Sequence, residues 1–190
     1  MNRTSKSVLA VTLFAFLALA PVLAFAQDMP PAEHKSIGLG FHNDNAPIGV
    51  RWWFSGQKVG LDLGLGYDRE SAAPDFPDEH LSRFTINGGI PIVLKSWSKV
   101  HFMFRPGISY ATQQVPDTTV TFNTVNEKTL QITGELEAEV FLAENFSVSA
   151  SHGIGYESFT PPFDGKKQNS LFTLGNNFTT IGFHVYLFGK

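Results

Sequence analysis

The residues best suited to chemistry in this chain lie in one short segment, Ser151-His152-Gly153-Ile154-Gly155-Tyr156-Glu157. A hydroxyl, an imidazole and a carboxylate held together can act as nucleophile, general base and the group that orients the base. The segment alternates like a β-strand, however, and successive side chains of a strand point to opposite faces. Ser151 and Glu157 would then project on one side and His152 on the other, unless a bulge at one of the glycines changes the register. We therefore predict no catalytic site here.

A second group that could do chemistry is the acidic ladder Glu135-x-Glu137-x-Glu139. Period two places its three carboxylates on one face of a strand. Three carboxylates fall short of the oxygen ligands that calcium requires, and the histidines outside the first segment show no metal-ligand spacing. We predict neither a metal nor a cofactor, and we interpret the ladder as a solvated or arginine-paired stripe.

Both groups lie in a chain whose dominant pattern is the alternation of apolar and polar residues with period two, without a credible helical stretch. The pattern predicts eight strands, over roughly residues 35–42, 47–54, 58–69, 81–94, 99–113, 129–142, 146–157 and 171–188. Short turns follow the second, fourth and sixth strands, the middle one at 95–98. Longer loops at 70–80, 114–128 and 158–170 connect the opposite ends, where only the first connection is short. Short turns at one end and long loops at the other are typical of an up-and-down barrel in a membrane.

Charged residues inside the predicted strands have the parity opposite to that of their apolar neighbours, whereas lysine falls mainly at strand ends, turns and loops. A soluble surface would normally scatter lysine along its polar face. We therefore expect the charged face to line the lumen of a closed barrel and the apolar face to point outward. The main members of the expected lumen network are Arg51, Asp62, Arg83, Arg105, Glu135 and Glu137.

Eight strands enclose a lumen that side chains can fill, so we expect a plug instead of an open pore. Buried charges must be paired, because an unpaired ion in a narrow lumen is costly. We predict that Arg83 and Arg105 face Glu135 and Glu137, and that Arg51 and Asp62 form a second group.

Two prolines conflict with this scheme. Pro91 and Pro106 lie inside predicted strands, and a closed barrel has no free edge at which a missing N–H is harmless. A β-bulge, or pairing that ends early at these points, would accommodate them.

The amino terminus predicts export. Arg3 and Lys6 precede an almost wholly apolar run, and Ala24-Phe25-Ala26 offers a small-residue cleavage pattern before Gln27. A membrane anchor is the competing interpretation, but a proline interrupts the run. We predict a signal peptide over residues 1–26, cleaved between Ala26 and Gln27, and a barrel domain over residues 27–190.

The composition of the exported part excludes several classes of protein. Removal of two cations leaves 14 − 2 = 12 Lys and Arg against 17 Asp and Glu, which gives no basic footprint for nucleic acid. The absence of cysteine excludes a disulfide scaffold and a thiolate metal site. Stability must come from burial or from a closed network of backbone hydrogen bonds.

The last strand carries a further signal, Thr180-x-Gly182-x-x-Val185-x-Leu187. It resembles the carboxyl-terminal pattern that the barrel assembly machinery recognises, although Gly189 and Lys190 follow the final aromatic residue. With the alternating strands and the loop asymmetry, residues 27–190 are similar to the small eight-stranded outer-membrane barrels of the OmpA-like and OmpX-like transmembrane families. The resemblance implies the cell outer membrane, reached after secretion across the inner membrane, and contact with outer-membrane lipid and lipopolysaccharide.

These observations favour a non-enzymatic barrel with a structural or surface-interaction role, in which the external loops meet an extracellular ligand. One alternative is a soluble periplasmic lipocalin-like binder of an apolar ligand, in which Leu61, Leu63 and Leu65 would point into a cavity. The other is a lipid A-modifying outer-membrane enzyme, for which His152 would be required.

Overall fold

The chain forms one antiparallel sheet that closes on itself. The computed structural model describes residues 36–41, 46–54, 56–71, 80–116, 124–162, 165–173 and 180–189. Within these residues, no helix is long and apolar enough to cross a membrane. The strands are β1 (Ile37–Phe41), β2 (Ile48–Trp53), β3 (Gly60–Ser71), β4 (His80–Gly89), β5 (Ile92–Trp97), β6 (Val100–Pro116), β7 (Thr124–Ala143), β8 (Phe146–Thr160), β9 (Gln168–Thr173) and β10 (Thr180–Phe188).

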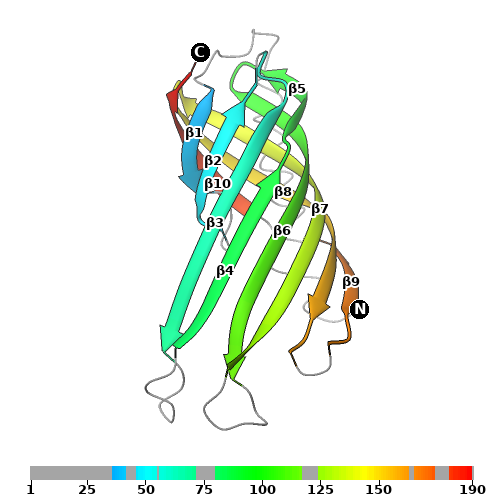
Figure 1. Cartoon of the computed structure of the whole chain (residues 1–190). Coiled ribbons are helices and arrows are strands. Elements are labelled where there is room, and N and C mark those ends of the chain that lie inside the picture. The colour runs from blue at the N-terminus through cyan, green and yellow to red at the C-terminus, as the bar shows by residue number, and fades with distance from the viewer. Residues whose placement is uncertain are drawn as a thin grey trace, which may run out of the picture.

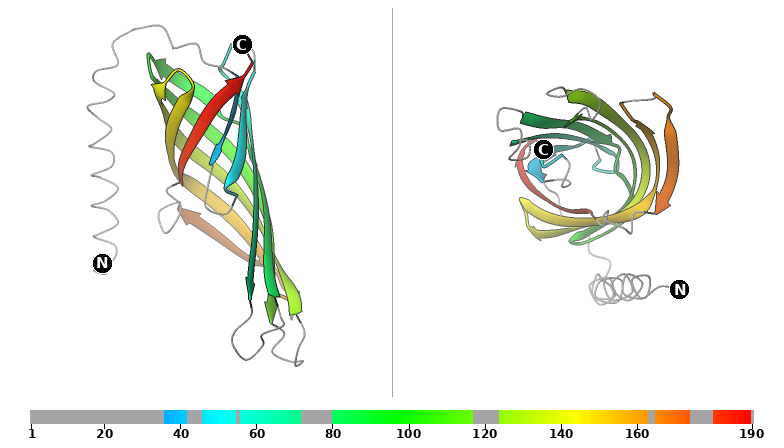
Figure 2. Two further views of the ribbon diagram at one scale, coloured as in Figure 1. Left: turned by 90° about the vertical axis from the view of Figure 1, so that its left-hand side faces the viewer. Right: turned by 90° about the horizontal axis from the view of Figure 1, so that it is seen from below.

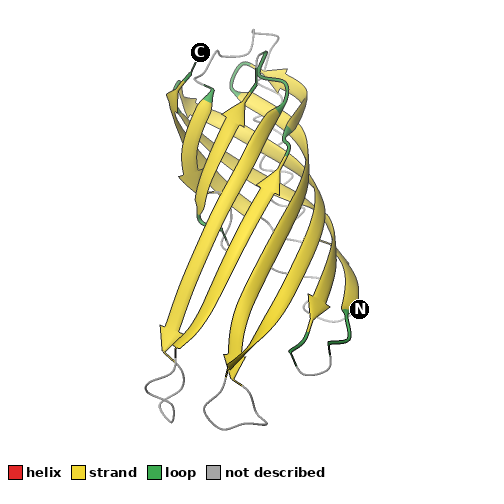
Figure 3. Cartoon of the chain, in the orientation of Figure 1, coloured by secondary structure: helices red, strands yellow, loops and turns green. Residues whose placement is uncertain are grey.

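These elements occupy eight positions around a barrel, because two of the positions are each filled by two short strands. β4 and β5 pair with successive parts of β6, and β9 and β10 pair with successive parts of β8. β10 also pairs with β1, which closes the wall. The pairing confirms the predicted eight-stranded antiparallel barrel. Figures 1 and 3 show the strands wrapping into its wall. The strand predicted over 81–94 is interrupted, and so is the one predicted over 171–188.

The two prolines explain the first interruption. Pro91 lies where β4 gives way to β5, and the amide of Ile90 donates to the carbonyl of Pro106 at 3.0 Å. The N–H and C=O of one residue in an antiparallel ladder point to the same side. The side of Pro106 that lacks an N–H therefore faces the gap between the end of β4 and the start of β5. β5 then shifts toward the start of β3, where the amide of Val93 donates to the carbonyl of Lys58 at 2.8 Å.

The wall is uneven in height. β6 and β7 have 17 and 20 residues, whereas β1 and β2 have 5 and 6. The β6–β7 ladder continues to the pair of Pro116 with Thr124, so most of the predicted loop over 114–128 is strand. β5 likewise runs to Trp97, which moves the predicted turn to residues 98–99. Two hairpins, β3–β4 and β6–β7, therefore extend past β1 and β2 at the end we call the loop end (lower end of Figure 1). The turns at 98–99 and 144–145 mark the opposite end, the turn end.

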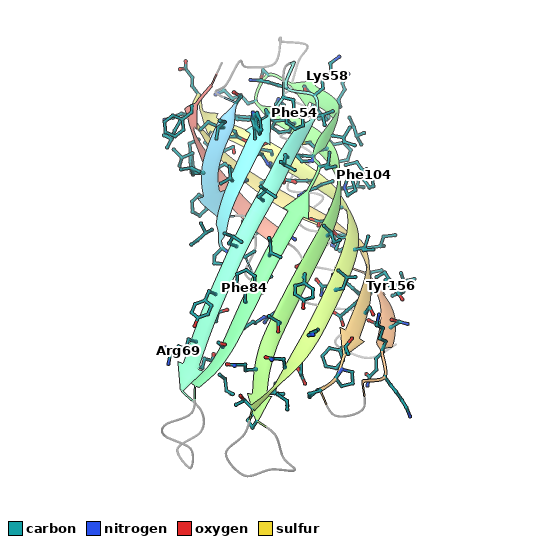
Figure 4. All side chains as sticks on the ribbon, viewed as in Figure 1. Phe54, Lys58, Arg69, Phe84, Phe104 and Tyr156 are labelled. Carbon is teal, nitrogen blue, oxygen red and sulfur yellow. The ribbon has the colours of Figure 1, made fainter. Side chains whose placement is uncertain are left out.

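The two faces of the wall differ as the parity predicts. Leu63 and Leu65 are 50% and 48% exposed, whereas Asp62 is 1% exposed. Phe54, Phe104 and Tyr156 are exposed on the outside of the wall (Figure 4). The exterior is therefore apolar. Seen from the loop end, the strands form a closed ring (Figure 2, right). Charged and hydroxyl side chains such as Arg51, Asp62 and Ser147 are buried inside it.

Candidate functional site

Arg51 bridges the lumen from one wall to the other. It lies on β2 directly opposite Asp62 of β3, and its Nε and Nη2 donate to the two carboxylate oxygens of Asp62 at 2.8 and 2.9 Å. Its Nη2 also donates to Oε1 of Glu137 at 2.8 Å, and its Nη1 to Oε2 of Glu139 at 3.1 Å. These two glutamates belong to β7. The fully buried guanidinium thus ties β2 and β3 to β7.

Arg105 joins the same carboxylate from β6. Its Nε donates to Oδ2 of Asp62 at 2.7 Å, its Nη1 to Oε1 of Glu135 at 3.1 Å, and its Nη2 to Oδ1 of Asn87 at 2.9 Å. Gly89 provides the space for this arginine, since a Cβ there would collide with the Arg105 guanidinium. Arg105, Glu135 and Glu137 of one predicted group therefore form a single network with Arg51 and Asp62 of the other, connected through Asp62.

Hydroxyl groups satisfy the remaining oxygens of two glutamates. Thr133 and Ser151 both donate to Glu135 at 2.8 Å. Glu139 accepts hydrogen bonds from Ser147 at 2.5 Å and from Tyr186 at 2.7 Å. Bonds of this kind to an ionised acceptor are among the stronger hydrogen bonds in proteins. They fix both carboxylates in place facing the arginines.

The turn end of the lumen is closed by aromatic side chains. The Nε1 of Trp53 donates to the Tyr186 hydroxyl at 3.0 Å, and Phe141 packs on Tyr186 with ring centroids 5.6 Å apart. The His101 ring lies edge-on to both Trp53 and Phe141. Because Trp53, Tyr186 and Met103 are at most 1% exposed, this cluster and the charged network together fill the lumen at this end.

The network has more acids than bases. Four carboxylates, those of Asp62, Glu135, Glu137 and Glu139, surround two guanidinium groups. Oε2 of Glu137 is buried and has no hydrogen-bond partner within the described residues. The guanidinium donors point at carboxylates and one amide inside the network, so this part of the lumen acts as a cross-brace between walls.

Arg83 does not join the network, contrary to the prediction. The β4–β6 register sets Arg83 opposite Gln113, whereas Glu135 lies opposite Arg105. Arg83 consequently lies closer to the loop end, and it forms no ion pair with any residue that the structure describes. It lines a small cavity together with Thr85, Ser109, Ala111, Thr129 and Gln131.

The hydroxyl, imidazole and carboxylate of the first candidate segment are not brought together. Ser151 points inward and donates to Glu135. His152 lies opposite the exposed Leu136 and therefore points outward. The carboxylate of Glu157 instead accepts a hydrogen bond from Gln131 at 2.7 Å.

The terminal pattern lies in β10, with Thr180 paired to Ser151 of β8 and Val185 to Leu39 of β1. Gly182 is buried and Leu187 is exposed. The predicted cleavage site at Ala26 and Gln27 lies outside the described residues.

The sequence prediction placed Glu139 in the acidic ladder, but it did not assign the uncharged side chains to the network, although the strand pattern contained a signal for them. Ser147 and Tyr186 share the inward parity of their strands, and Asn87 follows Arg83 and Thr85 on the inward side of β4. Parity identifies such residues as inward-facing, but only the register identifies their partners.

Comparison of the chain with protein-family models, with curated proteins and with solved structures finds no match. Its function must therefore be inferred from its own geometry.

Proposed function

We propose that this chain is a non-enzymatic β-barrel protein of the outer membrane, exported by a cleaved signal peptide, with a structural or surface-interaction role. The observation that carries the proposal is that the apolar face of the barrel points outward and the charged face points inward, the reverse of a soluble barrel. Apolar side chains such as Ile48 and Leu63 are 74% and 50% exposed on the outside, whereas Arg51 is 0% exposed inside. A continuous apolar exterior is unstable in water but suits hydrocarbon, where a closed sheet also satisfies the backbone hydrogen bonds.

The aromatic residues on the exterior support the same location. Trp52 and Phe54 are exposed near the turn end, while Tyr67, Tyr110 and Tyr156 are exposed toward the loop end. Tyrosine and tryptophan at two levels are typical of the girdles that flank the apolar band of such barrels. Beyond Tyr67, β3 continues as Asp-Arg-Glu-Ser, so this projecting part of β3 is polar on both faces. We infer that the projecting hairpins stand in the lipopolysaccharide headgroups and the water outside.

The soluble lipocalin-like alternative needs the opposite arrangement. It requires Leu61, Leu63 and Leu65 to line an apolar cavity. Leu63 and Leu65 are exposed on the exterior, and the neighbouring inward side chain is the ion-paired Asp62. The geometry therefore favours the membrane protein over the soluble binder.

The filled lumen supports a role at the surface in preference to transport. Among the described residues, a brace of two arginines and four carboxylates, together with aromatic side chains at the turn end, is buried in the lumen and fills that part of it. On such a rigid scaffold, the loops that connect the strands vary most in sequence, and binding sites commonly lie on them. We infer that partners meet the chain at the loop end, that lipid and lipopolysaccharide contact its sides, and that the barrel assembly machinery reads β10.

Two adjacent tryptophans allow a test of the embedding. Trp52 is 47% exposed on the exterior, while Trp53 is 1% exposed inside. In the full barrel reconstituted with brominated lipids, a variant that retains only Trp52 should be strongly quenched, and one that retains only Trp53 should be quenched little. Quenching of neither residue would contradict the membrane location, and equal quenching of both would contradict the assignment of faces.

The topology has its own test on intact cells. An epitope inserted within residues 117–123, after β6, should bind antibody from outside. The same epitope inserted at the turn between Glu144 and Asn145 should bind only after the cells are permeabilised. The reverse result would show that the two ends of the barrel are assigned the wrong way round.

A further inference from the structure

The loop end of the lumen contains a cavity on the inner face of β4, β6 and β7. It is small and opens to solvent. Thr85, Ala111 and Thr129 lie side by side across these three strands, and Ser109 lies beside Gln131 in the neighbouring layer. The small side chains at Ser109 and Ala111 create the space. The cavity is therefore separate from the filled network nearer the turn end.

Hydrogen-bond donors without protein partners line this cavity. Arg83 forms no ion pair with the described residues, and the hydroxyls of Thr85 and Thr129 make no hydrogen bond within the same part of the chain, although Thr85 is only 2% exposed. Ser109 reaches only the carbonyl of Ile86, at 3.4 Å. These donors face a cavity that is open to solvent, so they are available to a group that enters it. One cation and several hydroxyls select an anion with more than one oxygen.

Two carboxylates near the cavity oppose an anion and limit its affinity. Asp68 lies directly opposite Arg83 in the β3–β4 ladder without reaching it as an ion pair. Glu157 accepts the hydrogen bond of Gln131, which keeps that amide turned toward the protein. A lone spherical anion would meet this repulsion with few compensating contacts. A tetrahedral oxyanion can instead take two parallel N–H bonds from a guanidinium while its other oxygens reach hydroxyls.

We propose that the Arg83 cavity is a binding site for a phosphate-type oxyanion, held by the guanidinium of Arg83 and the hydroxyls of Thr85 and Thr129. This site goes beyond the proposed surface role, since it lies inside the barrel and does not depend on the external loops. The phosphate comes either from solution through the loop end or from the headgroup of a lipid beside the barrel. Both sources present the same oxygens to Arg83.

Side-chain NMR of the full barrel with ¹⁵N-labelled arginine, in phosphate-free detergent, tests the site directly. Titration with inorganic phosphate should give a saturable shift of the Arg83 Nε signal, which is identified by its absence from Arg83→Gln. The matched control is Arg69→Gln, which removes the same charge from an exposed position on the outer face of β3. It should leave the titration of Arg83 unchanged. Asp68→Asn should tighten binding about threefold, as expected for removal of one repelling charge roughly 6 Å away in water.

The outcomes distinguish a lipid headgroup from free phosphate as the ligand, and both of these from the absence of a site. A signal already shifted in bilayers containing a lipid with a phosphate monoester headgroup, without added phosphate, identifies the lipid as the source. A shift that needs added inorganic phosphate identifies the free ion. No saturable shift in either medium, or a shift that Asp68→Asn weakens, would overturn the site. Because the lipid-quenching result for Trp52 is independent of this titration, failure here leaves the membrane location standing.

Discussion

Removing the charge of Asp62 should destabilise the barrel by about 3–5 kcal/mol, the range found when one partner of a buried ion network is deleted. Asp62 accepts three charge-assisted hydrogen bonds, two from Arg51 and one from Arg105, at 2.7 to 2.9 Å. Each such bond contributes about 1.5–3 kcal/mol. Asparagine keeps one acceptor oxygen but turns an amide N–H₂ toward guanidinium donors. Part of the loss is offset because four carboxylates already surround two arginines.

Equilibrium unfolding in urea, with the barrel refolded into lipid vesicles, measures this loss. With a slope of about 2 kcal/mol/M, a loss of about 4 kcal/mol lowers the urea midpoint of Asp62→Asn by about 2 M. The matched control is Asp68→Asn, six residues along the same face of β3 but exposed, which should change stability by less than about 0.5 kcal/mol. Equal midpoints for the two variants would refute the reasoning, because they would show that the arginines find equivalent partners among the glutamates.

Three further changes test other parts of the lumen in the same assay. Glu137→Gln should alter stability by less than about 1 kcal/mol, because the glutamine oxygen can keep the hydrogen bond from Arg51 and the amide nitrogen replaces the oxygen that has no partner within the described residues; a loss of about 3 kcal/mol would contradict this. Gly89→Ala should cost about 1–3 kcal/mol, because its Cβ would collide with Arg105, whereas Gly88→Ala meets nothing closer than 3.7 Å; equal midpoints for these two variants would show that no clash occurs. Tyr186→Phe should cost about 1.5–3 kcal/mol, because its hydroxyl donates to a buried carboxylate at 2.7 Å, and an unchanged midpoint would argue against that bond.

The barrel could be predicted from the sequence because apolar and polar residues alternate with a period of two along each strand. The alternation of Leu61, Leu63 and Leu65 with Asp62 is visible without any partner strand, and it sets which side chains face inward. Strand number followed from the same pattern. Strand ends were less well predicted, because Thr and Val near residues 115–129 suit both a polar loop and a projecting hairpin.

Partners in the network could be predicted only where strands are adjacent. Arg51 and Asp62 lie on neighbouring strands joined by a short turn. They were predicted to form one group, and they lie directly opposite each other. The contact of Arg51 with Glu137 and Glu139 crosses the lumen and depends on barrel diameter and stagger, which no local pattern contains. The same limit explains the misplacement of Arg83.

The prolines show how a conflict in sequence can point to a real feature. Pro91 and Pro106 were incompatible with two unbroken strands, and the structure resolves the conflict with an early end to pairing at one shared point. The second interruption, between β9 and β10, has no proline. Six residues, 174–179, separate strands whose pairing partners on β8 are separated only by His152 and Gly153. No pattern in the sequence predicted that break.

Cell fractionation combined with gel migration tests most directly whether this barrel, with its apolar exterior and charged interior, resides in the outer membrane. The full chain, expressed in a Gram-negative host, should be recovered with the outer membrane. It should migrate at different positions before and after heating in detergent, because a closed barrel resists unfolding until heated. Recovery as a soluble periplasmic protein with a single band would contradict the proposal.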